Sequence, residues 1–287
     1  MFREISLLVR QAERSVAAGM KITQVEAIPL RGRGSQGAYG PPYGVVLRLT
    51  TDSGIEGYGE ADSMPAVVKA VVEAPFLNEM MSGLKWVLLG QDPLDIDGMW
   101  QRMAMATLNY SRDGATLQAM AAVDLALWDI KGKALGKPVC DLLGGARRQS
   151  LRCYATRPLG SSLHETDRYA RELRDTGFSA VKFGWYPLGP DAEQDTAIVA
   201  TLRRAIGEDA DLLIDGGLAW NVDTALDRLS RFEPYRLFWL EEPLRPYDFD
   251  GYARLTRASA TPIAAGASTT ATATASTWRP PFISPRR

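Results

Sequence analysis

Three charged residues in the second half of the chain are spaced so that they could form one chemical site. Lys182, Asp215 and Glu241 each close a short apolar run that predicts a β-strand, and they lie on successive predicted strand–helix units. The carboxyl ends of parallel strands meet at one edge of a sheet, so we expect the three side chains to converge there. Acids at strand ends also serve as helix N-caps or ion-pair partners, and for Lys182 the structural alternative is a salt bridge to Asp215 or Glu241.

The carboxylates of this predicted site could bind a metal ion. Asp215 and Glu241 supply hard oxygen ligands, and no His or Cys accompanies them. Such a set of donors suits Mg2+ better than Zn2+. The only histidine of the chain, His164, lies on a predicted helix, and we interpret it as a surface or capping-turn residue. A His-rich metal site is therefore excluded, as is any mechanism that needs two histidines.

Alternating strands and helices follow residue 151 and would position these side chains. The predicted strands are 152–156, 179–185, 211–216, 237–241 and 262–266, and the predicted helices are 162–176, 191–206, 223–231 and 249–258. The first of these helices opens with a capping box, in which Ser162 is the N-cap and Glu165 is the third helical residue. Repeated βα units of this length indicate parallel strands with right-handed crossovers, either in a doubly wound sheet or in a (β/α) barrel.

The first half of the chain predicts a separate α+β domain. Strands are predicted at 21–30, 45–50 and 55–60, and helices at 65–74, 93–105 and 114–135. The glycine-rich segment 31–44 lacks GxGxxG spacing and leads into no helix, so it is a poor phosphate cradle. It is either a mobile flap over a ligand or a plain surface loop, and we weigh the two evenly. Residues 1–19 have helical spacing and are interpreted as an N-terminal extension, or as the result of a start codon assigned too early.

Composition places the chain among ordinary globular proteins. Of its 287 residues 46% are hydrophobic, and 33 Lys and Arg against 34 Asp and Glu give a formal net charge of -1. This balance gives no electrostatic reason to expect nucleic acid or an acidic membrane as a partner, and no apolar run is long enough for a membrane span. The two cysteines, Cys140 and Cys153, cannot form a disulfide scaffold, so we expect a reduced, cytoplasmic setting.

Several segments carry a resemblance to a known family. AMAAVDLALWDIKGKALGKPVCDLLGG, at 119–145, resembles the signature of the mandelate racemase/muconate lactonizing enzyme family within the enolase superfamily. Four further stretches resemble strands of that family: AVKFGW at 180–185, LLIDGG at 212–217, WLEEPL at 239–244 and TPIAAG at 261–266. The resemblance implies an α+β capping domain over 20–145. It also implies an incomplete (β/α) TIM-type barrel over 146–287, with about six of eight strands.

The resemblance also implies a chemistry and a partner. It implies Mg2+ held by carboxylates at strand ends, which binds a substrate carboxylate and stabilises the enediolate formed when the α-proton is removed. By matching position, Asp215 and Glu241 are metal ligands and Lys182 is the catalytic lysine, whereas the neighbouring Glu242 is not assigned as a ligand. Loops of the capping domain, about 31–44 and 62–65, would close over the substrate. The implied partner is a small carboxylate such as an acid sugar, and the implied assembly is a homo-oligomer.

The chain departs from the family pattern in three places. Gly184 stands where the second lysine of K-x-K would act as a base, and Ala267 stands where a third carboxylate is due. The Ala-, Ser- and Thr-rich stretch 267–278 has no amphipathic period, and 282–285 resembles a remnant of a sixth strand. We therefore interpret the chain as a C-terminally truncated or frame-shifted member that is degenerate after residue 266. A true variant with a divergent tail is the less favoured alternative.

These features predict Mg2+-dependent abstraction of the proton alpha to a carboxylate. An acid-sugar dehydratase is preferred, with a racemase as the alternative within the same chemistry. A non-catalytic truncated remnant is a second prediction, because a base and a ligand are missing. A Schiff-base lyase using Lys182 as the nucleophile is a third, although the EEP motif argues against it.

Overall fold

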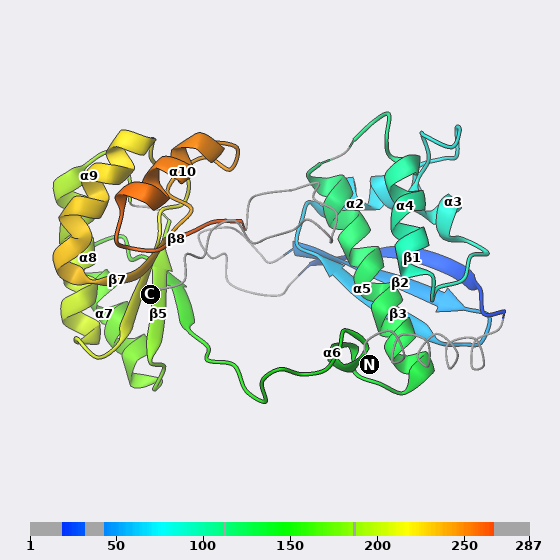
Figure 1. Cartoon of the computed structure of the whole chain (residues 1–287), viewed down its shortest axis with the longest axis horizontal. Helices are drawn as coiled ribbons and strands as arrows, with labels where there is room; N and C mark the ends of the chain where they lie inside the picture. The colour runs from blue at the N-terminus through cyan, green and yellow to red at the C-terminus, as the bar shows by residue number, and fades with distance from the viewer. Residues whose placement is uncertain (1–18, 32–42, 112, 186–187, 267–287) are drawn as a thin grey trace. The chain divides into compact units, whose positions relative to one another are not determined.

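The computed structural model of the chain describes residues 19–31, 43–111, 113–185 and 188–266. They form two compact units, shown in Figure 1, and the boundary between the units falls between Gln149 and Ser150. Each unit has its own hydrophobic core. The predicted N-terminal extension before Gly19, most of the glycine-rich segment, Ala267 and the expected remnant of a sixth strand lie outside the described residues. None of the helices in the described ranges is both long and apolar enough to cross a membrane.

An antiparallel sheet in the order β1-β2-β3 forms one layer of the first unit. Its strands are β1 (Ile22–Arg31), β2 (Tyr43–Thr51) and β3 (Glu56–Ala61). Side chains alternate between the two faces of a strand, and in β2 the alternate residues Val45, Leu47 and Leu49 are completely buried. The three strands predicted for this half of the chain are confirmed, and β2 and β3 pair as the expected hairpin.

Helices of the first unit cover one face of this sheet. They are α2 (Pro65–Glu73), α3 (Leu84–Leu88), α4 (Ile96–Ala106), α5 (Ala115–Leu135) and α6 (Val139–Leu142). In Figure 1, α2, α4 and α5 lie on the same side of the sheet, and their apolar residues share one core with it. The contact between α5 and β3 requires glycine, since a Cβ atom at Gly59 would lie 1.9 Å from the carbonyl oxygen of Ala122. The short helices α3 and α6 were not predicted.

The second unit repeats a strand and a helix along the chain. Its strands are β4 (Ala155–Pro158), β5 (Ala180–Gly184), β6 (Asp211–Asp215), β7 (Leu237–Glu241) and β8 (Ile263–Ala264). Its helices are α7 (Leu163–Asp175), α8 (Ala192–Ile206), α9 (Val222–Phe232) and α10 (Phe249–Ala258). The capping box at the start of α7 is present: the backbone N–H of Glu165 donates to the Ser162 hydroxyl at 3.2 Å.

The order of the strands decides between the two topologies left open by the sequence. All neighbouring strands are parallel, and they follow one another in chain order, β4-β5-β6-β7-β8. A doubly wound sheet reverses its strand order at a switch point, whereas a barrel does not. The helices lie on one side of these strands in Figure 1, as in a barrel wall. The second unit is therefore an incomplete barrel with five strands among the described residues.

The core of the second unit lies between the sheet and its helices. Val181 and Phe183 of β5 and Leu212 and Ile214 of β6 are completely buried in it. Because side chains alternate along a strand, the residues between them point to the opposite face, which is the interior side of a barrel. That opposite face carries Lys182.

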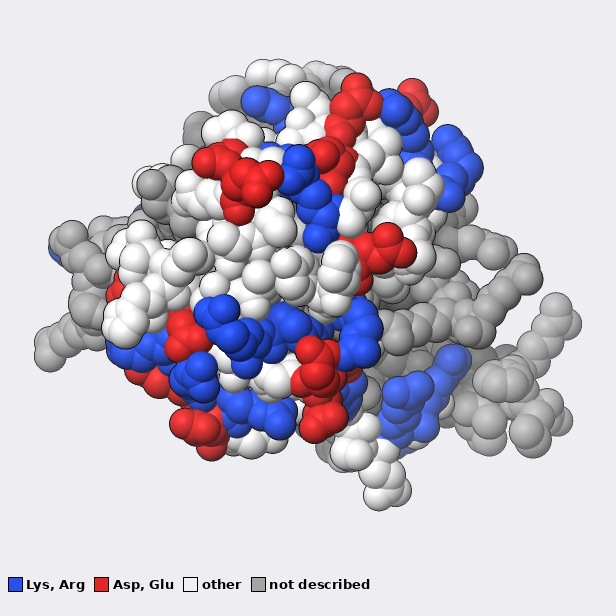
Figure 2. Space-filling view, turned by 90° about the vertical axis from the view of Figure 1, so that its left-hand side faces the viewer, with Lys and Arg blue, Asp and Glu red and all other residues white. Residues whose placement is uncertain are grey.

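The outer surface of the second unit carries both signs of charge side by side, as Figure 2 shows. Many of these charges are paired along the helices, as in the ion pairs Arg171–Asp167 and Arg231–Asp227. Pairs at this spacing on an exposed helix face contribute little to stability individually. Many charged side chains on this face are therefore accounted for by ion pairs with neighbouring residues.

Several predicted boundaries differ from the observed ones by up to three residues, as at the starts of α4 and β4 and at the end of β8. The first strand of the second half was predicted at 152–156, but β4 begins at Ala155, where it first pairs with β5 opposite Val181. Arg152 instead uses its side chain, donating to the carboxylate of Asp211 at 2.6 Å and to the carbonyl of Ser179 at 2.9 Å. The alternation of apolar and polar residues cannot distinguish a strand from a segment that, like 152–154, contacts the sheet through a side chain.

Candidate metal and acid site at the strand ends

Lys182, Asp215 and Glu241 lie together on the face of the sheet opposite to its helices. Gly184 of β5 is opposite Asp215 of β6, and Asp215 is opposite Glu241 of β7. Lys182 precedes Gly184 by two residues, so its side chain points to the same face. Three strands thus bring these three residues into contact at the carboxyl end of the sheet.

The ammonium group of Lys182 bridges the two carboxylates. Its Nζ atom lies 2.6 Å from Oε1 of Glu241 and 3.3 Å from Oδ2 of Asp215. Only 7% of Lys182 and 3% of Asp215 is exposed to solvent. Removing one member of such a buried group leaves an uncompensated charge, so the three residues depend on one another. The salt bridge considered for Lys182 from the sequence is therefore present, with both acids.

The second oxygen of each carboxylate is held by an N–H group. The backbone N–H of Gly217 donates to Oδ1 of Asp215 at 3.0 Å, and the indole N–H of Trp239 donates to Oε2 of Glu241 at 3.0 Å. Each acid thus has one oxygen fixed by the protein and one directed at the cation between them. Both carboxylates are oriented before any ligand arrives.

Aromatic rings surround the ammonium group on its other sides. The centroids of the Tyr154 and Trp185 rings both lie 5.8 Å from Nζ of Lys182, within the range of a cation–π contact. Tyr154 also meets Trp239 edge to face, with ring centroids 5.6 Å apart. These rings restrict water around the charges and so strengthen the electrostatic contacts among them.

The surroundings shift the pKa of Lys182 and of Asp215. Burial alone would lower the pKa of Lys182, but its hydrogen bond to Glu241 and the charges of Glu241 and Asp215 outweigh burial and raise that pKa. Burial raises the pKa of Asp215, an effect that the Gly217 N–H and the Lys182 charge oppose. Lys182 is therefore an ammonium ion while it bridges the two carboxylates.

Gly184 leaves no room for a second lysine on β5. A Cβ atom at this position would lie 2.4 Å from both Cβ and the carbonyl oxygen of Asp215. Such distances are far inside van der Waals contact. The packing of β5 against β6 therefore requires glycine at the position where the K-x-K pattern has its second lysine.

Glu242, which follows β7, occupies a different position from the acid before it. Its backbone has a φ of 39° and its N–H donates to the carbonyl of Ala264 at 2.8 Å. Its own carbonyl accepts from the N–H of Leu218 at 2.8 Å. Glu242 thereby ties the ends of β6, β7 and β8 together through its backbone.

The donors at this site fit Mg2+ with two protein ligands. The two carboxylates are hard oxygen donors that already hold one cation, the ammonium of Lys182, between them. Mg2+ commonly keeps several waters and uses one or two protein carboxylates. No group of three or more metal-binding side chains occurs among the described residues, and Ala267 lies outside them. Binding through two carboxylates is the arrangement that these residues allow.

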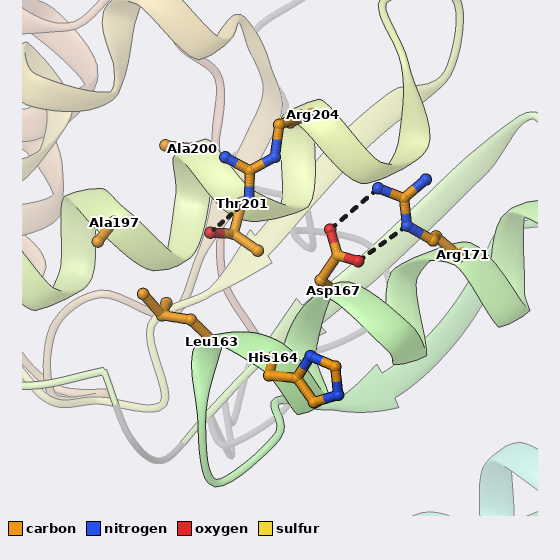
Figure 3. A pocket seen from close by; sticks show the side chains of 8 residues that line it. All are labelled: Leu163, His164, Asp167, Arg171, Ala197, Ala200, Thr201 and Arg204. Atoms are coloured by element: carbon orange, nitrogen blue, oxygen red, sulfur yellow. Dashed lines mark hydrogen bonds and ion pairs between the residues drawn. The ribbon is translucent and has the colours of Figure 1, made fainter.

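A separate cavity of about 600 Å³ lies between α7 and α8, away from the carboxylates. Figure 3 shows its lining: Leu163, His164, Asp167, Arg171, Ala197, Ala200, Thr201 and Arg204. His164 is exposed in the first turn of α7, as predicted, and Asp167 is paired with Arg171. The cavity is on the helix side of the sheet, so it is not the site at the strand ends.

Sequence reasoning missed Trp239 and Tyr154. A signal for Trp239 existed, because a residue two positions before Glu241 on a strand must share its face. Tyr154 gave no such signal, since it lies just before β4 and meets Trp239 only through the fold.

Two family profiles match the chain. "Mandelate racemase / muconate lactonizing enzyme, N-terminal domain" matches residues 33–144, and "Enolase C-terminal domain-like" matches residues 165–278. The two matches correspond to the two units of the structure in chain order.

Curated relatives with assigned names match most of the chain. L-talarate/galactarate dehydratase of Salmonella typhimurium is 36% identical over 62% of this chain and 45% of its own length. D-galactarolactone cycloisomerase of Agrobacterium fabrum is 34% identical over 77% of this chain and 57% of its own length. D-galactonate dehydratase of Pectobacterium atrosepticum is 33% identical over 86% of this chain and 61% of its own length. The chain spans about half the length of the first relatives it matches.

Solved structures show the same architecture. L-talarate dehydratase from Polaromonas sp. JS666, complexed with Mg and L-glucarate, superposes with a TM-score of 0.74 at 29% identity, covering 86% of this chain and 66% of that one. A racemase from Streptomyces coelicolor A3(2) with bound magnesium superposes with a TM-score of 0.75 at 28% identity. The match covers 85% of this chain and 69% of that one.

Proposed function

Because the chain belongs to the mandelate racemase/muconate lactonizing enzyme family of the enolase superfamily, we propose that it carries the machinery for Mg2+-dependent removal of a proton alpha to a carboxylate. Dehydration of an acid sugar is the preferred reaction, because the named relatives include galactarate and galactonate dehydratases. The observation that carries the proposal is the pair of buried carboxylates, Asp215 and Glu241, at neighbouring strand ends with Lys182 between them.

Each residue has a distinct part in this proposal. Asp215 and Glu241 would hold the metal ion through their carboxylates, each of which has one oxygen bonded to an N–H group of Gly217 or Trp239 and the other bonded to the ammonium of Lys182. Bound Mg2+ supplies positive charge that polarises a substrate carboxylate. Lys182, protonated and beside the same oxygens, provides a second positive charge where the enediolate develops. Gly184 offers no group to accept the α-proton, which in this proposal passes to a water molecule.

Electrostatic stabilisation and proton removal are separate contributions, and these residues supply the first. Preorganised charge commonly accounts for a factor of about 100 to 1,000 in rate. A general base contributes about the same order. A non-catalytic remnant is therefore the alternative. The observation that favours it is that Gly184, which has no side chain, stands where a lysine base is expected. The protonated state of Lys182 weighs against a Schiff-base lyase, since a nucleophilic lysine must lose its proton.

Turnover of acid sugars tests this proposal. The full chain is incubated with a panel of acid sugars and Mg2+, and keto-acid product is measured for the wild type, Lys182→Met and a surface control, Lys69→Met. Lys69 lies on α2 of the first unit and pairs with Glu73 on the same helix. We expect product that depends on Mg2+ and is lost in Lys182→Met alone. Absence of product with every substrate supports the remnant, and equal activity in Lys182→Met overturns the role of that residue.

A further inference from the structure

The two carboxylates share an arrangement that bears on which metal ion they accept. Oδ1 of Asp215 and Oε2 of Glu241 each accept an N–H donor at 3.0 Å, from Gly217 and Trp239 respectively. The remaining oxygens, Oδ2 and Oε1, face the ammonium group of Lys182. Each acid therefore presents a single oxygen to a cation.

This arrangement favours a small ion. Ca2+ takes six to eight oxygen ligands and often binds both oxygens of one carboxylate, whereas Mg2+ requires near-octahedral geometry and keeps its waters. A carboxylate whose second oxygen is already engaged is restricted to binding through one oxygen. The fixed N–H donors thus match the requirement of Mg2+ and oppose that of Ca2+.

Of the two donors, only Trp239 is a side chain. Its ring is held edge to face by Tyr154 at 5.6 Å and lies 5.4 Å from the ring of Phe238. This packing fixes the direction of the indole N–H towards Glu241. We propose that Trp239 is a positioning residue: by engaging Oε2, it restricts Glu241 to binding a metal ion through Oε1, the oxygen that contacts the Lys182 ammonium, and so makes the site selective for Mg2+ over Ca2+. The inference rests on the proposed metal site.

Groups that orient a metal ligand commonly change metal affinity by about 10- to 100-fold when they are removed. In Trp239→Phe the ring and its packing are kept and the N–H is lost. We expect Mg2+ affinity to fall about 10-fold, because Glu241 is no longer held in place. Ca2+ affinity should fall less or rise, because Oε2 of Glu241 loses its N–H donor and can join Oε1 in binding the larger ion. The ratio of the two dissociation constants is the measured quantity.

Isothermal titration of the full chain with Mg2+ and with Ca2+ tests this inference. Trp86→Phe is the matched control, because its indole N–H also donates a hydrogen bond, to the carbonyl of Ala74 in the first unit. Trp239→His, which keeps an aromatic N–H donor, serves as a second variant if Trp239→Phe shows no cooperative unfolding. We expect it to retain more Mg2+ selectivity than a variant without the donor, Trp239→Leu.

The outcomes separate the inference from the function on which it rests. If the wild type binds no Mg2+, the metal site fails, and the role of Trp239 fails with it. If the wild type binds Mg2+ and the ratio of Mg2+ to Ca2+ affinity in Trp239→Phe and in Trp239→Leu equals that of the wild type, only the role of Trp239 is overturned. A ratio that is reduced in Trp239→Phe and Trp239→Leu, less reduced in Trp239→His and unchanged in Trp86→Phe supports the inference.

Discussion

The Nζ atom of Lys182 lies 2.6 Å from Oε1 of Glu241, although 59 residues separate them in the chain. β6 lies between their strands, and its Asp215 also contacts the ammonium group, at 3.3 Å. The parallel register of β5, β6 and β7 creates this contact. Replacing any one of Lys182, Asp215 and Glu241 should therefore change the charge balance around the other two.

Replacing Lys182 by methionine should destabilise the second unit. The change keeps the length of the side chain but leaves Asp215 and Glu241 without their shared cation, which should cost about 3 kcal/mol of unfolding free energy. Because a divalent ion would compensate the same charges, Mg2+ should stabilise Lys182→Met more than the wild type. Urea unfolding with and without Mg2+ measures both effects. Lys182→Arg, which keeps a positive charge, is the control, and equal stability of all three proteins in metal-free buffer would contradict the account.

Gly184→Ala should be destabilising because of its position against β6. The new Cβ atom would lie 2.4 Å from Cβ of Asp215, so the strands must move apart, at a cost of about 1–3 kcal/mol. Gly44→Ala is the matched control in a strand, since among the described residues its Cβ would meet Oε1 of Glu60 at an ordinary contact distance of 3.6 Å. Thermal unfolding of the two variants gives the comparison. A Gly184→Ala protein as stable as Gly44→Ala would show that β5 has room for a side chain.

The loop before α8 depends on a buried ion pair. Asp195 accepts from Nε of Arg228 at 2.7 Å and from the backbone N–H of Gly189 at 3.0 Å, and it is completely buried. Asp195→Ala should cost about 3 kcal/mol, because Arg228 stays buried with one carboxylate fewer. Asp227, which also pairs with Arg228, is 48% exposed, and Asp227→Ala should cost at most about 1 kcal/mol. Chemical denaturation of the two variants tests this order, and a reversed order would refute it.

The start of α7 should lose stability in acid. Hydrogen bonds from Tyr169 and from the backbone and hydroxyl of Ser161 lower the pKa of Glu165 from 4.5 to about 2. A carboxyl with a lowered pKa in the folded state stabilises that state above its unfolded pKa, and the contribution disappears as the pH falls through the folded pKa. The advantage of the wild type over Glu165→Gln should thus be complete above about pH 4.5 and vanish towards about pH 2. Stability curves measured across this range would contradict the prediction if they ran parallel.

Much of this architecture could be predicted from the sequence because it is encoded locally. Strand ends at Asp215 and Glu241 follow from apolar runs closed by charge, and the capping box at Ser162 is a local hydrogen bond. The choice of a barrel over a doubly wound sheet did not follow from periodicity, because both use the same βα unit. It required the resemblance and then the strand order.

Other features could not be predicted because they arise from contacts between distant segments. Helix α3 has only five residues, and it is held by burial of Leu84 and Leu88 rather than by its own periodicity. The lack of space at Gly184 depends on the register with β6. The two-residue period of a strand places Trp239 and Glu241 on the same face, so their contact could have been predicted. A tryptophan in an apolar strand, however, suggested packing and not a hydrogen bond.

Direct titration of the full chain with Mg2+ tests the central claim, that Asp215 and Glu241 hold a divalent ion at the strand ends. The isosteric variants Asp215→Asn and Glu241→Gln remove one charge each while keeping the shape of the site. We expect one Mg2+ per wild-type chain and a loss of binding of at least about 10-fold in each variant. Undetectable binding to the wild type, or binding to both variants as tight as to the wild type, would contradict the account.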